Sequence, residues 1–509
     1  MRKNSLYNLL LVGVLCCACN SYLNEIPQNK LKPTTIDDYE QLLNRGYISK
    51  QIMPYLDVLS DDATLVPEFS ATLSNTRAAD IYASAYTWSS SHETSMPDGD
   101  KAFEAFYSSA YYANVVLENI DEATGINTDE EKTKELQGNL KGEAYVLRAY
   151  SYFNLVNLYA PAYNPSTCAT DPGIPINLTT DVDRKPYLRS TVEKVYVLIE
   201  EDLKEGIRLM EENPYDRGTK LRFNALSARA LLARVYLYMQ KWDLAIEQAN
   251  LVLKENSSLF DLNVAYLQNP SINASDVLSA YYMSDQMAGK DYLAVDNSNV
   301  LFVSGITENI MAFAARSYMT AFAVNEDLHN LYEDGDIRQN YFIRQVREFG
   351  DDGMVYKYIF AKNRYIDYPI GNFTFEINGS TGYSRVIRTE EMYLILAEAY
   401  AHKSGGLGNA IAALNTLRQA KYIAEDYNEL REEDYTQNTI LDRVWLERRL
   451  ELCFEGHRWF DLRRTTRPVM ERRGYGTQQA SLIENDPRYV LQIPQKELNV
   501  NPEIGINPR

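Results

Sequence analysis

Apolar residues recur at the three- and four-residue spacing of amphipathic helices over most of the chain. The periodic regions are about 34–58, 99–255 and 386–470. Ser190, with Glu193 three positions later, has the spacing of a capping box and predicts that a helix begins there. No comparable set of alternating strands is apparent, so the pattern predicts a mostly α-helical protein.

Two helical segments carry small and aromatic residues at tetratricopeptide-like spacing. Small residues at these positions let two antiparallel helices approach closely, while the aromatic residues fill the space beside them. An unrelated pair of helical hairpins is the alternative. The first segment has Ala233, Tyr236, Trp242, Ala245, Ala249 and Val252; the second, looser one has Ala397, Tyr400, Ala410, Leu414 and Leu417.

The helical periodicity fades over about 60–98 and 256–385, where Asn, Gly, Asp and Tyr become frequent. Long irregular segments inside a compact chain are usually functional loops or a lobe with some structure of its own. We therefore expect a ligand to bind at these two segments.

Charge and histidine content narrow the possible functions. The 509 residues include 51 Lys+Arg and 70 Asp+Glu, which gives a formal charge of −19. Because nucleic acid binds to basic surface, this acidic composition excludes broad electrostatic binding of nucleic acid. Only four histidines are present, so a multi-histidine metal centre is not expected. The acidic loops at 333–336 and 349–353 lack EF-hand spacing, which favours solvated loops over a calcium site.

One segment, FEGHRWFDLRR at 454–464, has the residue types of a catalytic site. It lacks the paired histidines of a zinc-binding helix, and the chain has no GxSxG or phosphate-binding motif. The alternating charges of this segment can instead pair within and between helices. We expect no enzymatic activity, no catalytic residues, no metal and no cofactor.

The N-terminus has the features of a targeting segment. Arg2 and Lys3 precede an apolar run over about 6–17 that is too short to span a bilayer permanently. Because cysteines end this run, it resembles a bacterial lipoprotein signal, with 1–18 removed and Cys19 acylated (palmitate). Cys17 is an alternative acylation site, and a plain secretory signal is the alternative to a lipoprotein signal.

Six motifs, in order along the chain, resemble the SusD/RagB family of outer-membrane nutrient-binding lipoproteins. They extend from residue 19 to 509, so the resemblance implies a single unit over 19–509. The motifs are CNSYLNEIPQ (19–28), LRAYSYFNLVNLYAPAYNP (147–165), LYEDGDIR (331–338), RVIRTEEMYLILAEAYA (385–401), FEGHRWFDLRR (454–464) and YVLQIPQKELNVNPEIGINPR (489–509).

The resemblance implies tetratricopeptide-like helix pairs that support a loop-rich ligand lobe. It also implies a lipid-anchored protein at the cell surface, on the outer membrane, that captures glycan for a SusC-type TonB-dependent transporter. Binding of peptides for the same kind of import, as in RagB-like members, is the alternative. No matched motif transfers a ligand contact to this sequence.

Candidate ligand residues therefore come from physical chemistry. Sugars present apolar C–H faces flanked by hydroxyls, so their recognition needs flat aromatic side chains beside polar groups. The irregular segments offer Tyr82, Tyr86, Trp88 and Tyr292 as stacking residues. The alternative, for Trp88 and equally for the tyrosines, is that the ring packs inward as part of the core.

Overall fold

The structure is a computed structural model, and it confirms the mostly α-helical class. It describes residues 33–65, 76–125, 128–181, 186–264, 292–306, 322–350, 353–360, 362, 368–370, 373–375, 383–473 and 479–509. Cys19 and the targeting segment lie outside these residues.

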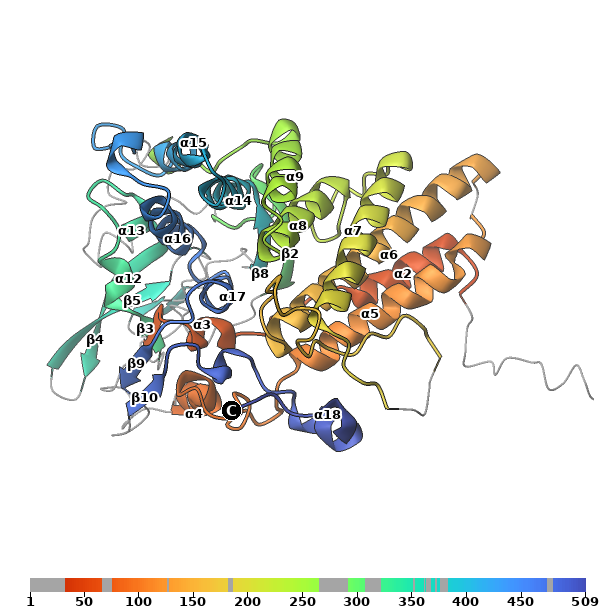
Figure 1. Ribbon diagram of the computed structural model, residues 1–509, viewed down its shortest axis with the longest axis horizontal. Helices are drawn as coiled ribbons and strands as arrows, with labels where there is room; N and C mark the ends of the chain where they lie inside the picture. The colour runs from red at the N-terminus through yellow and green to blue at the C-terminus, as the bar shows by residue number, and fades with distance from the viewer. Residues whose placement is uncertain are drawn as a thin grey trace, which may run out of the picture.

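Long helices that follow one another along the chain pack side by side into a helical body (Figure 1). Helix α14 continues this row, because it contacts α9 on one side and α15 on the other. The helices are α2 (Ile36–Gly46), α5 (Ala102–Asn119), α6 (Glu130–Tyr159), α7 (Val192–Glu212), α8 (Ala225–Tyr238), α9 (Trp242–Glu255), α14 (Thr389–Ala401), α15 (Leu407–Gln419) and α16 (Thr439–Leu452).

Small residues set the close approach of these helices. Helices α6 and α7 cross at Gly142 and Gly206, where a Cβ atom on either glycine would lie 2.7 Å from the carbonyl oxygen of the other. On α9, Ala245, Ala249 and Val252 are fully buried, as the repeat pattern predicts.

The start of α7 differs slightly from its prediction. Its N-cap is Thr191, one residue after Ser190, and the Thr191 hydroxyl accepts a hydrogen bond from the amide of Lys194 at 3.3 Å. Thr191 is thus the residue that satisfies a backbone donor in the first helical turn.

The expectation of a chain without a set of strands is wrong for the irregular segments. Strand β1 (Ala63–Leu65) pairs with β3 (Phe322–Val324), and β5 joins β3 to β4 in an antiparallel sheet of order β1-β3-β5-β4. The remaining strands form three two-stranded sheets. These sheets are β2 (Val300–Ile306) with β8 (Tyr383–Arg388), β6 (Tyr368–Ile370) with β7 (Phe373–Phe375), and β9 (Met470–Arg473) with β10 (Gln479–Leu482). In the four-stranded sheet, β4 spans Ile343–Gly350 and β5 spans Gly353–Phe360.

Some of the short helices lie beside the four-stranded sheet, and we call this side of the molecule the sheet lobe (Figure 1). Helix α4 (Thr76–Tyr86) lies within 60–98, a segment that we expected to be irregular. The other short helices are α3 (Tyr55–Leu59), α12 (Glu326–His329), α13 (Arg338–Phe342), α17 (Arg458–Arg464) and α18 (Gln495–Val500), with 3-10 turns at Ile120–Glu122, Glu432–Asp434, Pro487–Tyr489 and Pro502–Ile504.

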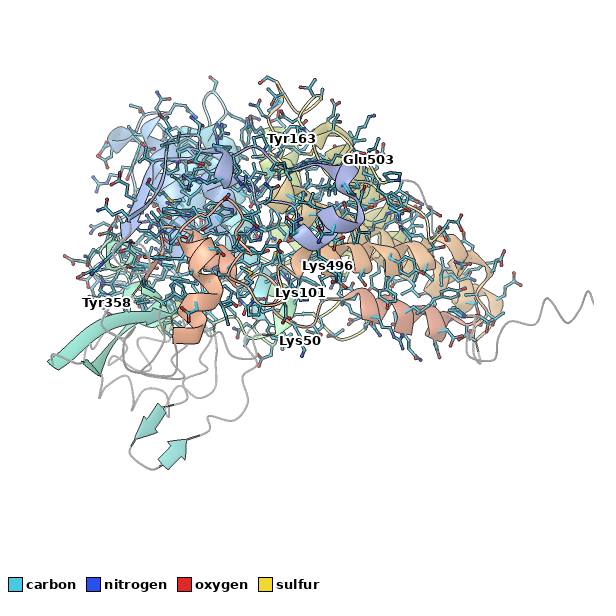
Figure 2. All side chains as sticks on the ribbon, turned by 90° about the horizontal axis from the view of Figure 1, so that it is seen from below. Lys50, Lys101, Tyr163, Tyr358, Lys496 and Glu503 are labelled. Atoms are coloured by element: carbon cyan, nitrogen blue, oxygen red, sulfur yellow. The ribbon has the colours of Figure 1, made fainter. Side chains whose placement is uncertain are left out.

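The C-terminal segment is fastened to the helical body. Asn507 is buried, donates to the carbonyl oxygens of Tyr159 (2.9 Å) and Leu491 (2.7 Å), and accepts from Arg189. Figure 2 shows Lys496 of α18 beside the start of α5, where an ion pair of 2.7 Å joins it to Glu104.

Candidate functional site

The FEGHRWFDLRR segment, which follows α16 and contains α17, belongs to a buried cluster of charges. Glu451 accepts hydrogen bonds from Arg388 (2.7 Å) and Arg338 (3.1 Å), and Glu455 accepts from Lys362 (2.7 Å) and Arg388 (2.8 Å). All five side chains are at most 5% exposed. The cluster joins α16 to β8 and α13, so these charges stabilise the fold.

The pKa shifts in this cluster follow from its pairing. Burial alone would raise the pKa of Glu455, but the charges of Arg388 and Lys362 outweigh it and lower that pKa to about 2. Burial raises the pKa of the Cys453 thiol to about 11, so this cysteine is a protonated thiol at neutral pH. The cluster therefore contains neither a free base nor an activated nucleophile.

The segment's histidine is also inert at neutral pH. Burial lowers the pKa of His457 to about 4, and its Nδ1 atom lies 3.4 Å from Arg448. Asp461 accepts from Arg448 (2.8 Å) and from Arg464 (2.8 Å). These contacts confirm the prediction that the charges of this segment pair within and between helices.

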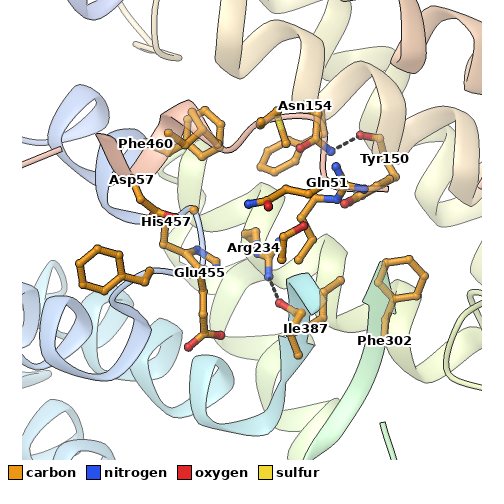
Figure 3. Close-up of a pocket in the computed structure, with 18 of the residues that line it drawn as sticks. Gln51, Asp57, Tyr150, Asn154, Arg234, Phe302, Ile387, Glu455, His457 and Phe460 are labelled. Carbon is orange, nitrogen blue, oxygen red and sulfur yellow. Dashed lines mark hydrogen bonds between the residues drawn. The ribbon is translucent and has the colours of Figure 1, made fainter. Parts of the chain in front are cut away.

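An interior cavity of about 60 Å³ lies beside this segment, between α3, α6, α8 and β8 (Figure 3). Its wall includes Gln51, Asp57, Asn154, Arg385 and His457. A water molecule needs roughly 10–15 Å³ of such space, whereas ligand pockets are about 300–1,000 Å³. The cavity therefore fits a few water molecules and is too small for a glycan.

Three of the four predicted stacking residues are buried. Tyr86, Trp88 and Tyr292 are 1%, 2% and 0% exposed, so the expectation that their rings face solvent is wrong. The predicted alternative, inward packing, holds for all three rings.

Polar contacts explain why these rings are accommodated inside. The Trp88 indole donates to the carbonyl oxygen of Leu59 at 2.9 Å, and the Tyr292 hydroxyl donates to Glu451 at 2.5 Å. The Tyr86 hydroxyl accepts from the amide of Leu65 at 3.1 Å. Each ring fills a core while its polar atom is satisfied.

Tyr82 differs from the other three residues. It is half-buried on α4 and packs at the edge of both the main core and the core beneath the sheet. Its role in binding a ligand stays a prediction.

Ion pairs with arginine side chains hold the acidic loop 333–336 in place. Asp336 pairs with Arg338 at 2.7 Å, and Glu333 accepts from Arg418 at 2.9 Å. Among the described residues, no group of three or more His, Cys, Asp or Glu side chains could hold a metal ion. Within the same residues, no helix has the length and apolar character needed to cross a membrane.

A ligand-sized pocket lies at a place that no sequence pattern marks as a binding site. It has a volume of about 460 Å³ and is bounded by α6, α7 and the start of α8. The loop 213–224, which joins α7 to α8, forms its mouth and carries Tyr215, 41% exposed. The sequence marks this loop only as a helix break, through Pro214 and Gly218.

Two family models match the chain. Residues 21–237 match a SusD-like model described as "Starch-binding associating with outer membrane", and residues 363–509 match the SusD family model. The chain is 24% identical over 439 residues to SusD-like protein P2 of Formosa agariphila, which covers 81% of each chain.

Solved structures share the fold. A SusD superfamily protein from Bacteroides thetaiotaomicron has a TM-score of 0.69 at 24% identity, covering 94% of this chain and 100% of that one. A laminarin-binding SusD-like protein has a TM-score of 0.59 at 21% identity, covering 94% and 100%. The chain belongs to the SusD/RagB family.

Proposed function

We propose that this protein is a glycan-binding lipoprotein of the outer-membrane surface that delivers glycan to a SusC-type TonB-dependent transporter. The observation that carries the proposal is the family assignment, because one matched model is described as starch-binding and outer-membrane associated. The likeness to a laminarin-binding protein adds support for a glycan over other nutrients.

The chemistry of the interior supports a binding role over a catalytic one. The acidic and basic groups of the 454–464 segment are paired with one another and removed from water. A catalytic acid or base has to reach substrate with a pKa near the working pH, whereas Glu455 and His457 are buried and have pKa values of about 2 and about 4. Tyr82, on the sheet lobe, remains our candidate for a stacking residue.

A binding screen tests the proposal. Protein lacking 1–18, with Cys19 replaced by Ala, is run through native gels that contain starch, laminarin or no polysaccharide. It is also titrated with mixed peptides. We expect at least one polysaccharide to retard the protein relative to serum albumin, with no saturable heat from peptides. Saturable peptide binding without retardation would favour the peptide alternative, and binding of neither would refute a nutrient-binding role.

A further inference from the structure

The pocket beneath the 213–224 loop has the size and lining of a ligand site. Its volume of about 460 Å³ falls within the roughly 300–1,000 Å³ of typical small-molecule pockets. Pro214, Tyr215 and Leu226 supply apolar surface, while Asp216 and Thr219 supply polar groups. Such a mixture matches a pyranose, which has C–H faces and an edge of hydroxyls.

The charges around the pocket favour a neutral ligand. Arg222 donates two hydrogen bonds of 2.7 Å to Glu143, and Arg217 donates to Glu40 at 2.7 Å. Because each guanidinium already faces a carboxylate, and Asp216 adds a further carboxylate to the lining, the described lining of the pocket has no cationic group left to pair with an anion. A hydroxyl-rich neutral molecule loses less on entering such a site than a charged one does.

Several polar atoms at the mouth keep unused hydrogen-bonding capacity. Asp216 accepts from the amide of Gly218 through Oδ1, and no hydrogen bond among the described residues occupies its Oδ2. Thr219 accepts from the amide of Leu221, so its hydroxyl proton is available to an acceptor. The Nη2 atom of Arg217 has no hydrogen-bond partner among the described residues.

The loop is fixed in place before any ligand arrives. The amide of Val303 on β2 donates to the carbonyl oxygen of Lys220 at 2.9 Å, and the amide of Phe223 donates to the Tyr47 hydroxyl at 2.9 Å. The Arg217 guanidinium lies 4.9 Å from the centre of the Tyr215 ring and holds that ring at the mouth. A preorganised loop loses little conformational freedom on binding.

We infer that this pocket is a glycan subsite on the helical body, separate from the sheet lobe, that takes a neutral sugar unit at Tyr215, Asp216 and Thr219. The inference rests on the proposed function. A subsite remote from the lobe would let one protein hold a long polysaccharide at two points, which raises its overall affinity without new contacts at either point.

The test compares two exposed tyrosines. Tyr215 is 41% exposed at the pocket and Tyr111 is 47% exposed on α5, so Tyr111→Ala is a matched control for Tyr215→Ala. Parent and both variants, each lacking 1–18 and carrying Cys19→Ala, are titrated calorimetrically with maltohexaose and laminarihexaose. We expect Tyr215→Ala to weaken the binding of whichever hexaose binds by about tenfold, with Tyr111→Ala and both melting temperatures unchanged.

Hydrogen exchange locates the effect. At a hexaose concentration near the Kd of the parent protein, the ligand should slow exchange in peptides covering 213–226 clearly in the parent and only weakly in Tyr215→Ala. Unchanged affinity of Tyr215→Ala together with unchanged exchange over 213–226 would overturn the subsite and leave the proposed function standing. If the parent binds neither these hexaoses nor any polysaccharide of the screen, the proposed function fails and the subsite fails with it.

Discussion

Burial shifts the pKa values of two side chains on the wall of the interior cavity in opposite directions. Burial lowers the pKa of His457 to about 4, below its ordinary value near 6.5. Burial, with the nearby carboxylate of Asp62, raises the pKa of Asp57 to about 7. The folded protein therefore holds a neutral imidazole and a carboxyl group that is partly protonated at neutral pH.

The pKa shift of His457 predicts a loss of stability in acid. As the pH falls from about 6.5 towards 4, the unfolded chain binds a proton at this residue that the folded protein does not. Relative to the parent, His457→Gln should therefore gain about 2 kcal/mol of unfolding free energy between pH 7 and pH 4.5. Urea unfolding at a series of pH values measures this difference.

Asp57→Asn is a control for which the unfolding free energy, relative to the parent, should change with pH in the opposite direction. Because the folded pKa is raised, the parent loses stability at this residue as the pH rises from about 4 to about 7. Asp57→Asn should gain roughly 3 kcal/mol over the parent between pH 4.5 and pH 8. A pH-independent difference for either variant would show that its group titrates at the same pH in both states.

The buried tyrosines show what single-residue reasoning could not determine. Tyrosine suits a wet binding surface and a polar-edged core equally well, so composition does not separate the two. The choice depends on distant partners: Tyr292 is buried with its hydroxyl donating a hydrogen bond to Glu451, 159 positions away. The exposed Tyr215, in contrast, lies in a short loop between predicted helices, where no local pattern marked it.

Whole helices were more predictable than strands. Helical periodicity develops over ten or more residues of one segment, so the sequence predicted a helical region over about 99–255, which contains α6, α7, α8 and α9. Strands β1 and β3 have three residues each and pair across the chain, Ala63 opposite Val324. Two alternations of polarity are too few to detect, and the pairing itself has no local signal.

The helix pair of α8 and α9 gives a prediction about packing. Ala245 is fully buried on α9, which packs against α8 and α14, so an indole there has no space. Overpacking a core typically costs about 1–3 kcal/mol, and more when the backbone is held on both sides. We expect Ala245→Trp to abolish cooperative folding, measured by thermal melting and by recovery of soluble protein.

Asn250→Trp on the same helix is the matched control. Asn250 is exposed, so a tryptophan there should leave the melting temperature within a few degrees of the parent. An Ala245→Trp protein that melts cooperatively at the parent temperature would contradict the close helix contact.

At the scale of the molecule, ion pairs join parts of the chain that are far apart in sequence. Asp61, beside α3, accepts two hydrogen bonds of 2.7 Å from Arg458, and Arg234 of α8 donates to Glu391 of α14 at 2.7 Å. The family motifs predicted the fold because several of them supply these buried charges, which have partners only in the complete fold. They gave no prediction of a ligand contact.

The last prediction concerns how this molecule is held at the membrane. Cys19 follows the small residue Ala18 at the end of the apolar run, and we predict that it carries the acyl chains. Several chains on one residue anchor stably, since each buried CH₂ contributes about 0.8 kcal/mol. In cells lacking the transporter, Cys19→Ala should move the protein from the membrane pellet to the supernatant, assayed by immunoblot. Cys17→Ala should leave it in the pellet. Retention of Cys19→Ala together with release of Cys17→Ala would assign the anchor to Cys17, and retention of both variants would rule out either cysteine as its single anchor.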